Sequence, residues 1–218
     1  MVPCLNEAAA IGLVAAELRG HVSAVLIVDD GSSDGTRRVA EATGAEVLCF
    51  PATLGKGAAL QAGWQHARQR GFRWVLTLDG DGQHSPADAP IFFRCAEQTS
   101  AALIVGNRMS DSVRMPWLRQ AANRWMSRRI SKIAGRPLPD SQCGFRLIRL
   151  DLLAGLPITA EHFEVESDTL LAFVRAGLRV EFVAIQAIYK QEQSKIHLWC
   201  DLVRWLRWWW RVTRRHSE

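Results

Sequence analysis

Acidic residues that follow strand-like segments constrain this fold more than any other feature of the sequence. Strand-like segments at 24–29, 46–49, 73–78 and 101–105 alternate with helix-like segments at 34–43, 56–70 and 87–98. This alternation predicts βαβ units and a parallel sheet. Asp29 and Asp30 end one predicted strand, and Asp79 and Asp81 follow another. In open α/β sheets ligands bind beyond the carboxyl ends of the strands, so we expect a ligand site at these acids.

The second half of the chain has a different pattern. A long, basic, amphipathic helix is predicted at 117–134, and further elements follow at 142–148, 165–176, 179–185 and 198–215. We find no internal repeat and no low-complexity linker, so we expect one α/β domain over 1–195 and an amphipathic helix over 196–218. No apolar run approaches the ~20 residues that a spanning helix needs, so we expect no transmembrane segment.

The Asp79-Gly80-Asp81 segment is a candidate metal site. Two carboxylates that are one residue apart on a loop can converge on Mg²⁺ or Mn²⁺, which prefer oxygen ligands and share their shell with substrate phosphates. A calcium loop of the EF-hand kind is excluded because Pro90 stands where an acid is required. The alternative is a turn whose two acids face water.

Two further loops are candidates for nucleotide contacts. Asp30 follows a strand and precedes a helix, where a carboxylate can accept hydrogen bonds from a base or ribose, although 34–35 can also be a simple capped turn. No G-x-G-x-x-G is present there, which disfavours a dinucleotide fold. Lys56 lies in a Gly-Lys-Gly segment that lacks the Ser or Thr of a P-loop, and we expect it to contact a phosphate.

Taken together, the motifs resemble glycosyltransferase family 2. The matching segments are Pro-Cys-Leu-Asn-Glu at 3–7, Asp-Asp-Gly-Ser-Ser-Asp-Gly-Thr at 29–36 and Asp-Gly-Asp-Gly-Gln-His at 79–84. Within the family the chain is most similar to the dolichyl-phosphate mannose synthase-like branch of polyprenyl-phosphate glycosyltransferases. Later motifs of that branch are matched at 106–108, 140–146 and 194–196.

The resemblance implies a GT-A fold, a nucleotide-sugar donor and a specific set of site residues. It implies donor contacts at Pro3, Leu5, Glu7, Asp30, Lys56 and Asp79, and a metal held by Asp79, Asp81 and Gln83. It implies a catalytic set that includes Asp81, Arg108 and Lys195. The first strand of such a fold should precede Pro3, where only Met1 and Val2 stand, so we expect this strand to be truncated.

The segment 108–136 is strongly basic, with eight basic side chains and one acidic one. Arg124 and Arg128 are four residues apart on one helix face and are candidates to hold an acceptor phosphate. A phosphate monoester with a second pKa near ~6 is already anionic at neutral pH and needs no general base. A hydroxyl acceptor needs one, for which Asp140 is the candidate, unless Asp140 is only a turn residue.

The C-terminal segment concentrates tryptophan: five of the nine tryptophans lie within 199–210. At helical spacing, apolar side chains including Trp205, Trp209 and Val212 share one side, and arginines lie largely on the other. Tryptophan and arginine together are typical of a helix at a bilayer interface. The alternative is a helix that packs on its own domain or on a twin subunit, which would make a homo-oligomer.

The sequence therefore predicts an inverting, metal-dependent glycosyltransferase, peripheral on the cytoplasmic face of a membrane. Its expected substrates are a nucleoside-diphosphate sugar and a polyprenyl phosphate, with Mg²⁺ or Mn²⁺ as cofactor and no nucleic-acid partner. Two alternatives remain at this stage. One is transfer to a glycan hydroxyl, and the other is a non-catalytic, membrane-associated nucleotide-binding protein.

Overall fold

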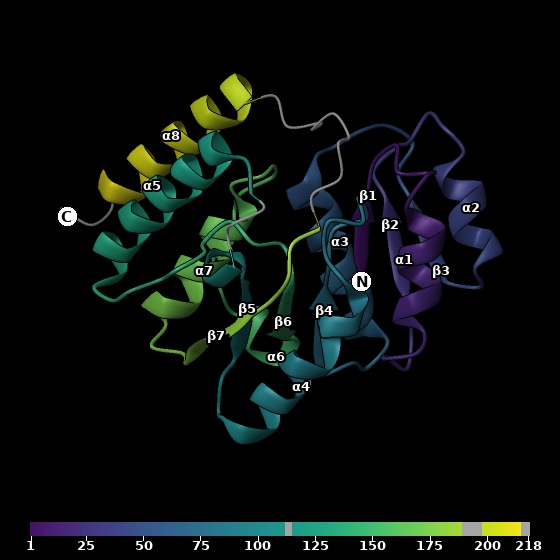
Figure 1. Cartoon of the computed structure of the whole chain (residues 1–218), viewed down its shortest axis with the longest axis horizontal. Coiled ribbons are helices and arrows are strands. Elements are labelled where there is room, and N and C mark those ends of the chain that lie inside the picture. The colour runs from purple at the N-terminus through teal and green to yellow at the C-terminus, as the bar shows by residue number, and fades with distance from the viewer. Residues whose placement is uncertain (112–114, 189–197, 215–218) are drawn as a thin grey trace.

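Two sheets lie side by side at the centre of the molecule (Figure 1). The computed structural model describes residues 1–111, 115–188 and 198–214. The first sheet is parallel, with the order β1 (Val2–Cys4), β2 (Leu26–Asp29) and β3 (Glu46–Cys49). The second has the order β4 (Trp74–Thr77), β6 (Arg146–Arg149), β5 (Leu103–Asn107) and β7 (Val180–Ala184). Leu78 N donates to the Met1 carbonyl at 3.2 Å, which joins the sheets between β1 and β4.

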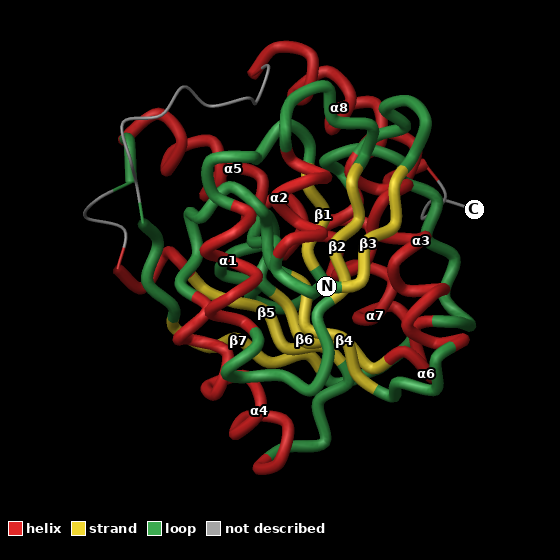
Figure 2. The backbone as a smooth tube through the Cα atoms, turned by 90° about the vertical axis from the view of Figure 1, so that its right-hand side faces the viewer, coloured by secondary structure: helices red, strands yellow, loops and turns green. Residues whose placement is uncertain are grey.

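Helices surround both sheets (Figure 2). In chain order they are α1 (Ile11–Leu18), α2 (Thr36–Ala42), α3 (Lys56–Gln69), α4 (Ala89–Gln98), α5 (Trp117–Ala134), α6 (Leu150–Leu153), α7 (Val165–Arg175) and α8 (Leu198–Arg214). Two short 3₁₀ turns, η1 (Pro86–Asp88) and η2 (Arg108–Asp111), precede α4 and follow β5. No helix within the described residues is long and apolar enough to cross a bilayer.

The core follows directly from the apolar strands. Ile27 and Val28 in β2 and Leu103 to Val105 in β5 are fully buried, as expected for strands that are covered on both faces. Each such side chain contributes about 1.5–3 kcal/mol of transfer free energy to folding. Gly63 allows α3 to approach the first sheet closely, because a Cβ at this position would lie 3.1 Å from Val28 Cγ2.

The structure confirms the predicted α/β architecture. Its first strand, β1, is short: it includes Pro3 and Cys4 and pairs with β2 over three residues. The expectation that this strand is truncated stays a prediction. Bonds on both sides hold this short strand, because Asp30 N donates to the Cys4 carbonyl at 2.9 Å and β4 adjoins at Met1. In the second sheet, β6 is antiparallel to both of its neighbours, β4 and β5, so this sheet is mixed.

The C-terminal helix packs on the protein body, beside α5 (Figure 1). Trp205, Trp208 and Val212 are buried, whereas the sequence pattern placed Trp205 and Val212 on a face toward the membrane. Two of its indoles have partners within the protein: Trp205 Nε1 donates to Ser167 Oγ and Trp208 Nε1 donates to Asp168 Oδ1, both at 3.0 Å. The side of the helix that carries Trp205, Trp208 and Val212, here called the inner face, therefore packs on its own domain, as the alternative interpretation expected.

Candidate functional site

The carboxyl ends of β2 and β4 bring the predicted acids to the same edge of the two sheets. Asp30 is buried, and its two oxygens accept hydrogen bonds from Leu54 N at 2.8 Å and Gly55 N at 2.9 Å. These bonds fix the loop that leads into α3. Helix α3 begins at Lys56, directly after this loop, so the hydrogen bonds to Asp30 help to fix the position of Lys56.

Lys56 bridges two carboxylates at the centre of the site. Its Nζ lies 2.7 Å from Asp79 Oδ1 and 2.6 Å from Glu166 Oε1. Burial by itself lowers the pKa of Lys56, but the charges of Asp79 and Glu166 outweigh burial and raise the pKa above its usual range. The amine is therefore a permanent positive charge, placed between the loop after β4 and the first turn of α7.

Asp79 is held as a carboxylate. Burial raises its pKa, but Lys56 and the other basic side chains nearby together outweigh burial and lower the pKa to about 2. Its carboxylate lies against the backbone of Gly144, where a Cβ would come within 2.6 Å of Asp79 Oδ2. Only glycine fits at position 144, and the acid loop therefore packs directly on the 140–146 loop.

Asp81 differs from Asp79, whose carboxylate forms an ion pair with Lys56. Burial and then the nearby charge of Asp79 raise the pKa of Asp81. Asp81 Oδ1 accepts a hydrogen bond from Gln83 N at 2.9 Å, and Gln83 Oε1 accepts one from Arg119 Nη1 at 3.0 Å. The acid loop thus contacts the beginning of the basic helix α5.

These residues fit a divalent cation that is shared with a diphosphate. No cluster of three His, Cys, Asp or Glu side chains suited to a metal occurs among the described residues. Mg²⁺, however, is usually held by one or two carboxylates with substrate phosphates completing its shell. Asp79 and Asp81 form such a pair, and their mutual repulsion is what a cation would relieve. The amide oxygen of Gln83 is already paired with Arg119.

Arg108 and Asp140 form a buried ion pair at the end of β5. Arg108 Nε donates to Asp140 Oδ2 at 2.8 Å and Nη2 to Oδ1 at 2.9 Å. The backbone N–H groups of Arg108 and Gln142 also donate to this carboxylate. Burial raises the pKa of Asp140, but Arg108 lowers it further than burial raises it. Both Asp140 oxygens therefore already accept hydrogen bonds. This arrangement suits a structural ion pair better than a general base.

The 140–146 loop is tied to α7 by the buried Arg146, the last residue of a predicted family motif, for which the sequence analysis gave no individual role. Arg146 donates to the carbonyl oxygens of Cys143 at 2.7 Å, Ser141 at 3.0 Å and Glu166 at 2.6 Å. Three carbonyls around one guanidinium fix the loop and the first turn of α7 together, and the planar fork of donors suits this arrangement.

The remaining predicted residues lie in different settings. Pro3 is buried in β1, and Leu5 and Glu7 are half-buried in the turn that follows. Arg124 and Arg128 are exposed on α5. Lys195 lies outside the described residues. The roles of all these residues in substrate binding or catalysis remain predictions.

Glu166 is a residue of this site to which the sequence analysis assigned no role. The available signal was weak: it is an acid at the start of a helix whose first nine residues are all buried. A buried acid requires a buried cation, but nothing in the sequence indicates that Lys56 is this cation.

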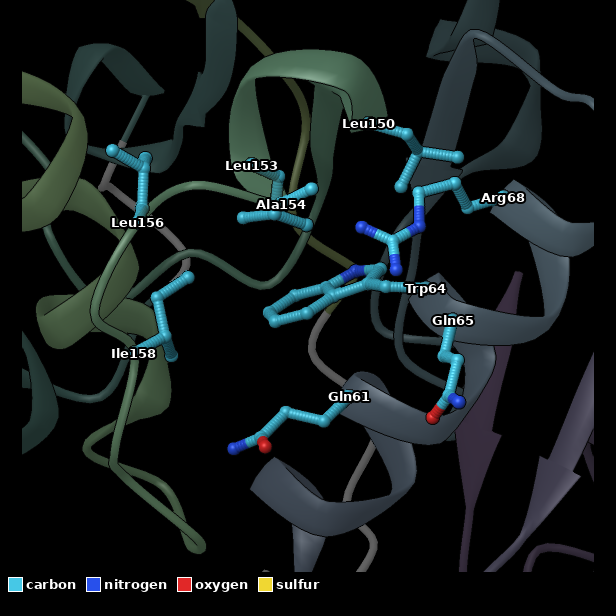
Figure 3. Close-up of a pocket in the computed structure, with 9 residues that line it drawn as sticks. All are labelled: Gln61, Trp64, Gln65, Arg68, Leu150, Leu153, Ala154, Leu156 and Ile158. Atoms are coloured by element: carbon cyan, nitrogen blue, oxygen red, sulfur yellow. The ribbon is translucent and has the colours of Figure 1, made fainter.

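A separate hollow of about 270 Å³ lies between α3 and the segment around α6 (Figure 3). It is lined by Gln61, Trp64, Gln65, Arg68, Leu150, Leu153, Ala154, Leu156 and Ile158. None of the acids described above lines it, and we therefore place the functional site at the strand ends.

The fold and the paired acids at its strand ends define a glycosyltransferase of the GT-A fold. The structure superposes on glucosyl-3-phosphoglycerate synthase from Mycobacterium tuberculosis, in complex with Mn²⁺, uridine diphosphate and phosphoglyceric acid, with a TM-score of 0.72. The two chains are 21% identical, and the match covers 94% of this chain and 73% of the other. The family model of Glycosyl transferase family 2 matches residues 1–156, and the chain belongs to that family.

Curated relatives confirm the resemblance to the polyprenyl-phosphate branch. The chain is 29% identical over 205 residues to undecaprenyl-phosphate mannosyltransferase from Micrococcus luteus, covering 88% of this chain and 83% of the relative. It is 26% identical over 214 residues to UDP-N-acetylglucosamine–dolichyl-phosphate N-acetylglucosaminyltransferase from Methanococcus voltae, covering 88% and 85%. The chain is thus a glycosyltransferase, as predicted.

Close packing at the start of α3 leads to a first prediction. A Cβ on Gly57 would lie 2.4 Å from the Ala160 carbonyl oxygen, so Gly57→Ala has to displace backbone beside Lys56. We expect a loss of about 1–3 kcal/mol in the free energy of unfolding, measured by urea denaturation. Gly155→Ala is the control, since no atom lies within 4 Å of its Cβ and its effect should stay within about 0.5 kcal/mol. Equal stability of the two variants would contradict this packing.

The buried pair leads to a second prediction. Asp140→Leu leaves Arg108 charged, buried and without this carboxylate, and should cost about 3–5 kcal/mol of unfolding free energy. The double variant Asp140→Leu/Arg108→Met removes both charges and should lose less than Asp140→Leu alone, because replacing a whole buried pair is often nearly neutral. Denaturant titration of the three proteins measures this difference. A double variant less stable than Asp140→Leu would show that the charges are not coupled.

Proposed function

We propose that this protein is an inverting, metal-dependent glycosyltransferase that moves a sugar from a nucleoside diphosphate to a polyprenyl phosphate. The observation that carries the donor half is the pair Asp79 and Asp81 beside the fixed positive charge of Lys56. A diphosphate that departs from a sugar gains negative charge, and cations near it stabilise the transition state. Structural neighbours that contain Mn²⁺ and uridine diphosphate support the same assignment.

In the proposed reaction, the acceptor oxygen attacks the anomeric carbon of the sugar from the face opposite to the leaving diphosphate. The bond from this carbon to the diphosphate oxygen breaks, and the configuration inverts. Asp81 and Asp79 would hold the divalent ion, which neutralises charge on the diphosphate when bound. Lys56 fixes the orientation of Asp79, and Arg119 fixes Gln83 at the side toward α5.

A phosphate acceptor explains the site better than a hydroxyl acceptor. Its oxygen is anionic at neutral pH, so no side chain has to remove a proton. Asp140, the base that a hydroxyl acceptor would need, is paired through both oxygens with Arg108. Arg119 contacts the acid loop, and the exposed Arg124 and Arg128 continue along the same helix, where guanidinium groups suit a phosphate. The names of the two curated relatives support a lipid phosphate acceptor.

The outer face of α8 suits contact with a membrane surface. Val203, Leu206 and Trp210 are exposed there, among arginines at 204, 207, 211 and 214. The Arg214 guanidinium lies 3.6 Å from the centroid of the Trp210 ring. Apolar and aromatic side chains enter the headgroup region, and each arginine adds about 1 kcal/mol of attraction to anionic lipid. Peripheral binding through this face would place the enzyme where its lipid acceptor resides.

The function is tested with labelled nucleotide sugars, incubated with undecaprenyl or dolichyl phosphate and Mn²⁺. We expect label to move into the lipid extract with release of nucleoside diphosphate. Asp81→Asn should abolish both, because it removes a ligand charge from the site that neutralises the diphosphate, and excess chelator should do the same to the parent protein. Label recovered on a soluble glycan would indicate a hydroxyl acceptor instead. Nucleotide binding without any transfer would indicate a non-catalytic protein, and full activity in chelator would refute metal dependence.

Membrane contact is tested by sedimentation with anionic vesicles at low salt. The double variant Leu206→Ser/Trp210→Ser removes two exposed apolar side chains and should release most of the protein from the vesicles, because their burial in the interface is lost. Leu13→Ser, on α1 at the other side of the molecule, removes a leucine that is more exposed than Leu206 and should sediment like the parent (Figure 1). Equal sedimentation of all three proteins would show that α8 is not the contact.

A further inference from the structure

The inner face of α8 contacts two consecutive residues of α7. Trp205 Nε1 donates to Ser167 Oγ and Trp208 Nε1 donates to Asp168 Oδ1, each at 3.0 Å. Both indole rings are buried, with 3% and 1% of their surface exposed. Packing alone would hold α8 in place with phenylalanine at these positions. The two indole N–H groups add directed contacts to one particular turn.

That turn of α7 is shared with the catalytic site. Glu166 is the residue before Ser167, and its Oε1 lies 2.6 Å from Lys56 Nζ. Ser167 Oγ also accepts a hydrogen bond from Gln142 Nε2 at 2.7 Å, and Gln142 belongs to the 140–146 loop. Three consecutive residues therefore join α8 on one side to Lys56 and to that loop on the other.

Asp168 extends the connection to the beginning of α3. Its second oxygen, Oδ2, accepts hydrogen bonds from Thr159 N at 2.8 Å and Ala160 N at 3.1 Å. The next carbonyl, that of Glu161, accepts the N–H groups of Gly57 at 2.8 Å and Ala58 at 3.2 Å. These two amides directly follow Lys56. Trp208 is thus linked through Asp168 and one loop to the helix end that carries the lysine.

We propose that Trp205 and Trp208 are positioning residues of the transferase: they brace α7 so that Lys56 and Gln142 keep their places. The proposal rests on the proposed function for what the site binds, but the brace itself is a statement about this chain alone. It gives α8 two separate roles. The outer face contacts a membrane surface, and the inner face transmits the position of the helix to the donor site.

The brace has a reciprocal consequence. If docking of α8 holds Lys56 in place, then anything that holds Lys56 in place also favours docked α8, since coupling between two sites acts equally in both directions. A nucleotide bound at Asp79 and Asp81 should therefore slow hydrogen exchange in α8, and a lipid surface bound to α8 should tighten nucleotide binding.

The test uses the full chain and Trp208→Phe, which keeps an aromatic ring but removes the N–H donor. Amide hydrogen exchange at Gly57 and Ala58 should accelerate, while exchange at Ile27 and Val28 in β2 stays as in the parent. Affinity for uridine or guanosine diphosphate with Mn²⁺, measured by calorimetry without lipid, should fall about two- to tenfold, the effect of one hydrogen bond. Trp117→Phe makes the same exchange at an indole that is exposed on α5, so it is the matched control and should change neither quantity.

A second variant separates the brace from general stability. Asparagine at position 168 has one oxygen, so Asp168→Asn cannot serve both Trp208 and the amides of Thr159 and Ala160. It should reproduce the exchange and affinity changes of Trp208→Phe with little change in side-chain volume. Unchanged exchange at Gly57 and Ala58 in both variants would overturn the proposal. If the parent binds neither nucleotide, the proposed function is wrong, and the exchange data still decide the brace.

Discussion

The site depends on one buried cation between two acids. Lys56 Nζ contacts Asp79 and Glu166 within 2.7 Å, and through them it joins the start of α3, the loop after β4 and the first turn of α7. Burying a charge is costly unless its partners compensate, so none of these three segments can move away alone without leaving an unpaired ion in the interior. The same contact leaves Asp81 as the acid whose charge is least compensated, and this suits it to a metal that arrives with its substrate.

Much of the fold was predictable because strands and helices alternate with a clear period, and because acids follow the strands. Asp79, Asp81 and Asp30 are found at the strand ends, as the sequence indicated. The partners of these acids were not predictable. Glu166 is far from Lys56 in the sequence, and the motif that ends at Arg146 does not indicate that backbone carbonyls enclose this arginine. Pairings of this kind depend on which loops meet in space, and local patterns carry no record of that.

The C-terminal helix shows a related limit of pattern reasoning. A helical period identifies an apolar side but does not say whether protein or lipid covers it. The pattern placed Trp205, Leu206 and Trp209 together on a membrane face. Of these, Trp205 is buried on α7 and Leu206 is exposed, and Val203 and Trp210 are exposed as well. A tryptophan N–H is satisfied equally by headgroups and by a serine or aspartate in the protein. Only the tertiary structure distinguishes these cases, and here it divides the helix into a buried face and an exposed face.

The burial of Arg108 and Arg146 changes how the charge of this protein should be counted. Both contribute to the formal net charge of +5, but one is neutralised by Asp140 and the other is enclosed by backbone carbonyls. The Arg108–Asp140 pair has no net charge and projects little field into solvent, whereas the uncharged carbonyls around Arg146 do not cancel its charge. The long-range field toward an anionic surface comes instead from the exposed arginines of α5 and α8, and mobile ions damp it beyond about 8 Å at physiological salt. Approach to a charged surface is therefore sensitive to ionic strength, whereas the internal pairs that hold the site together are largely shielded from it.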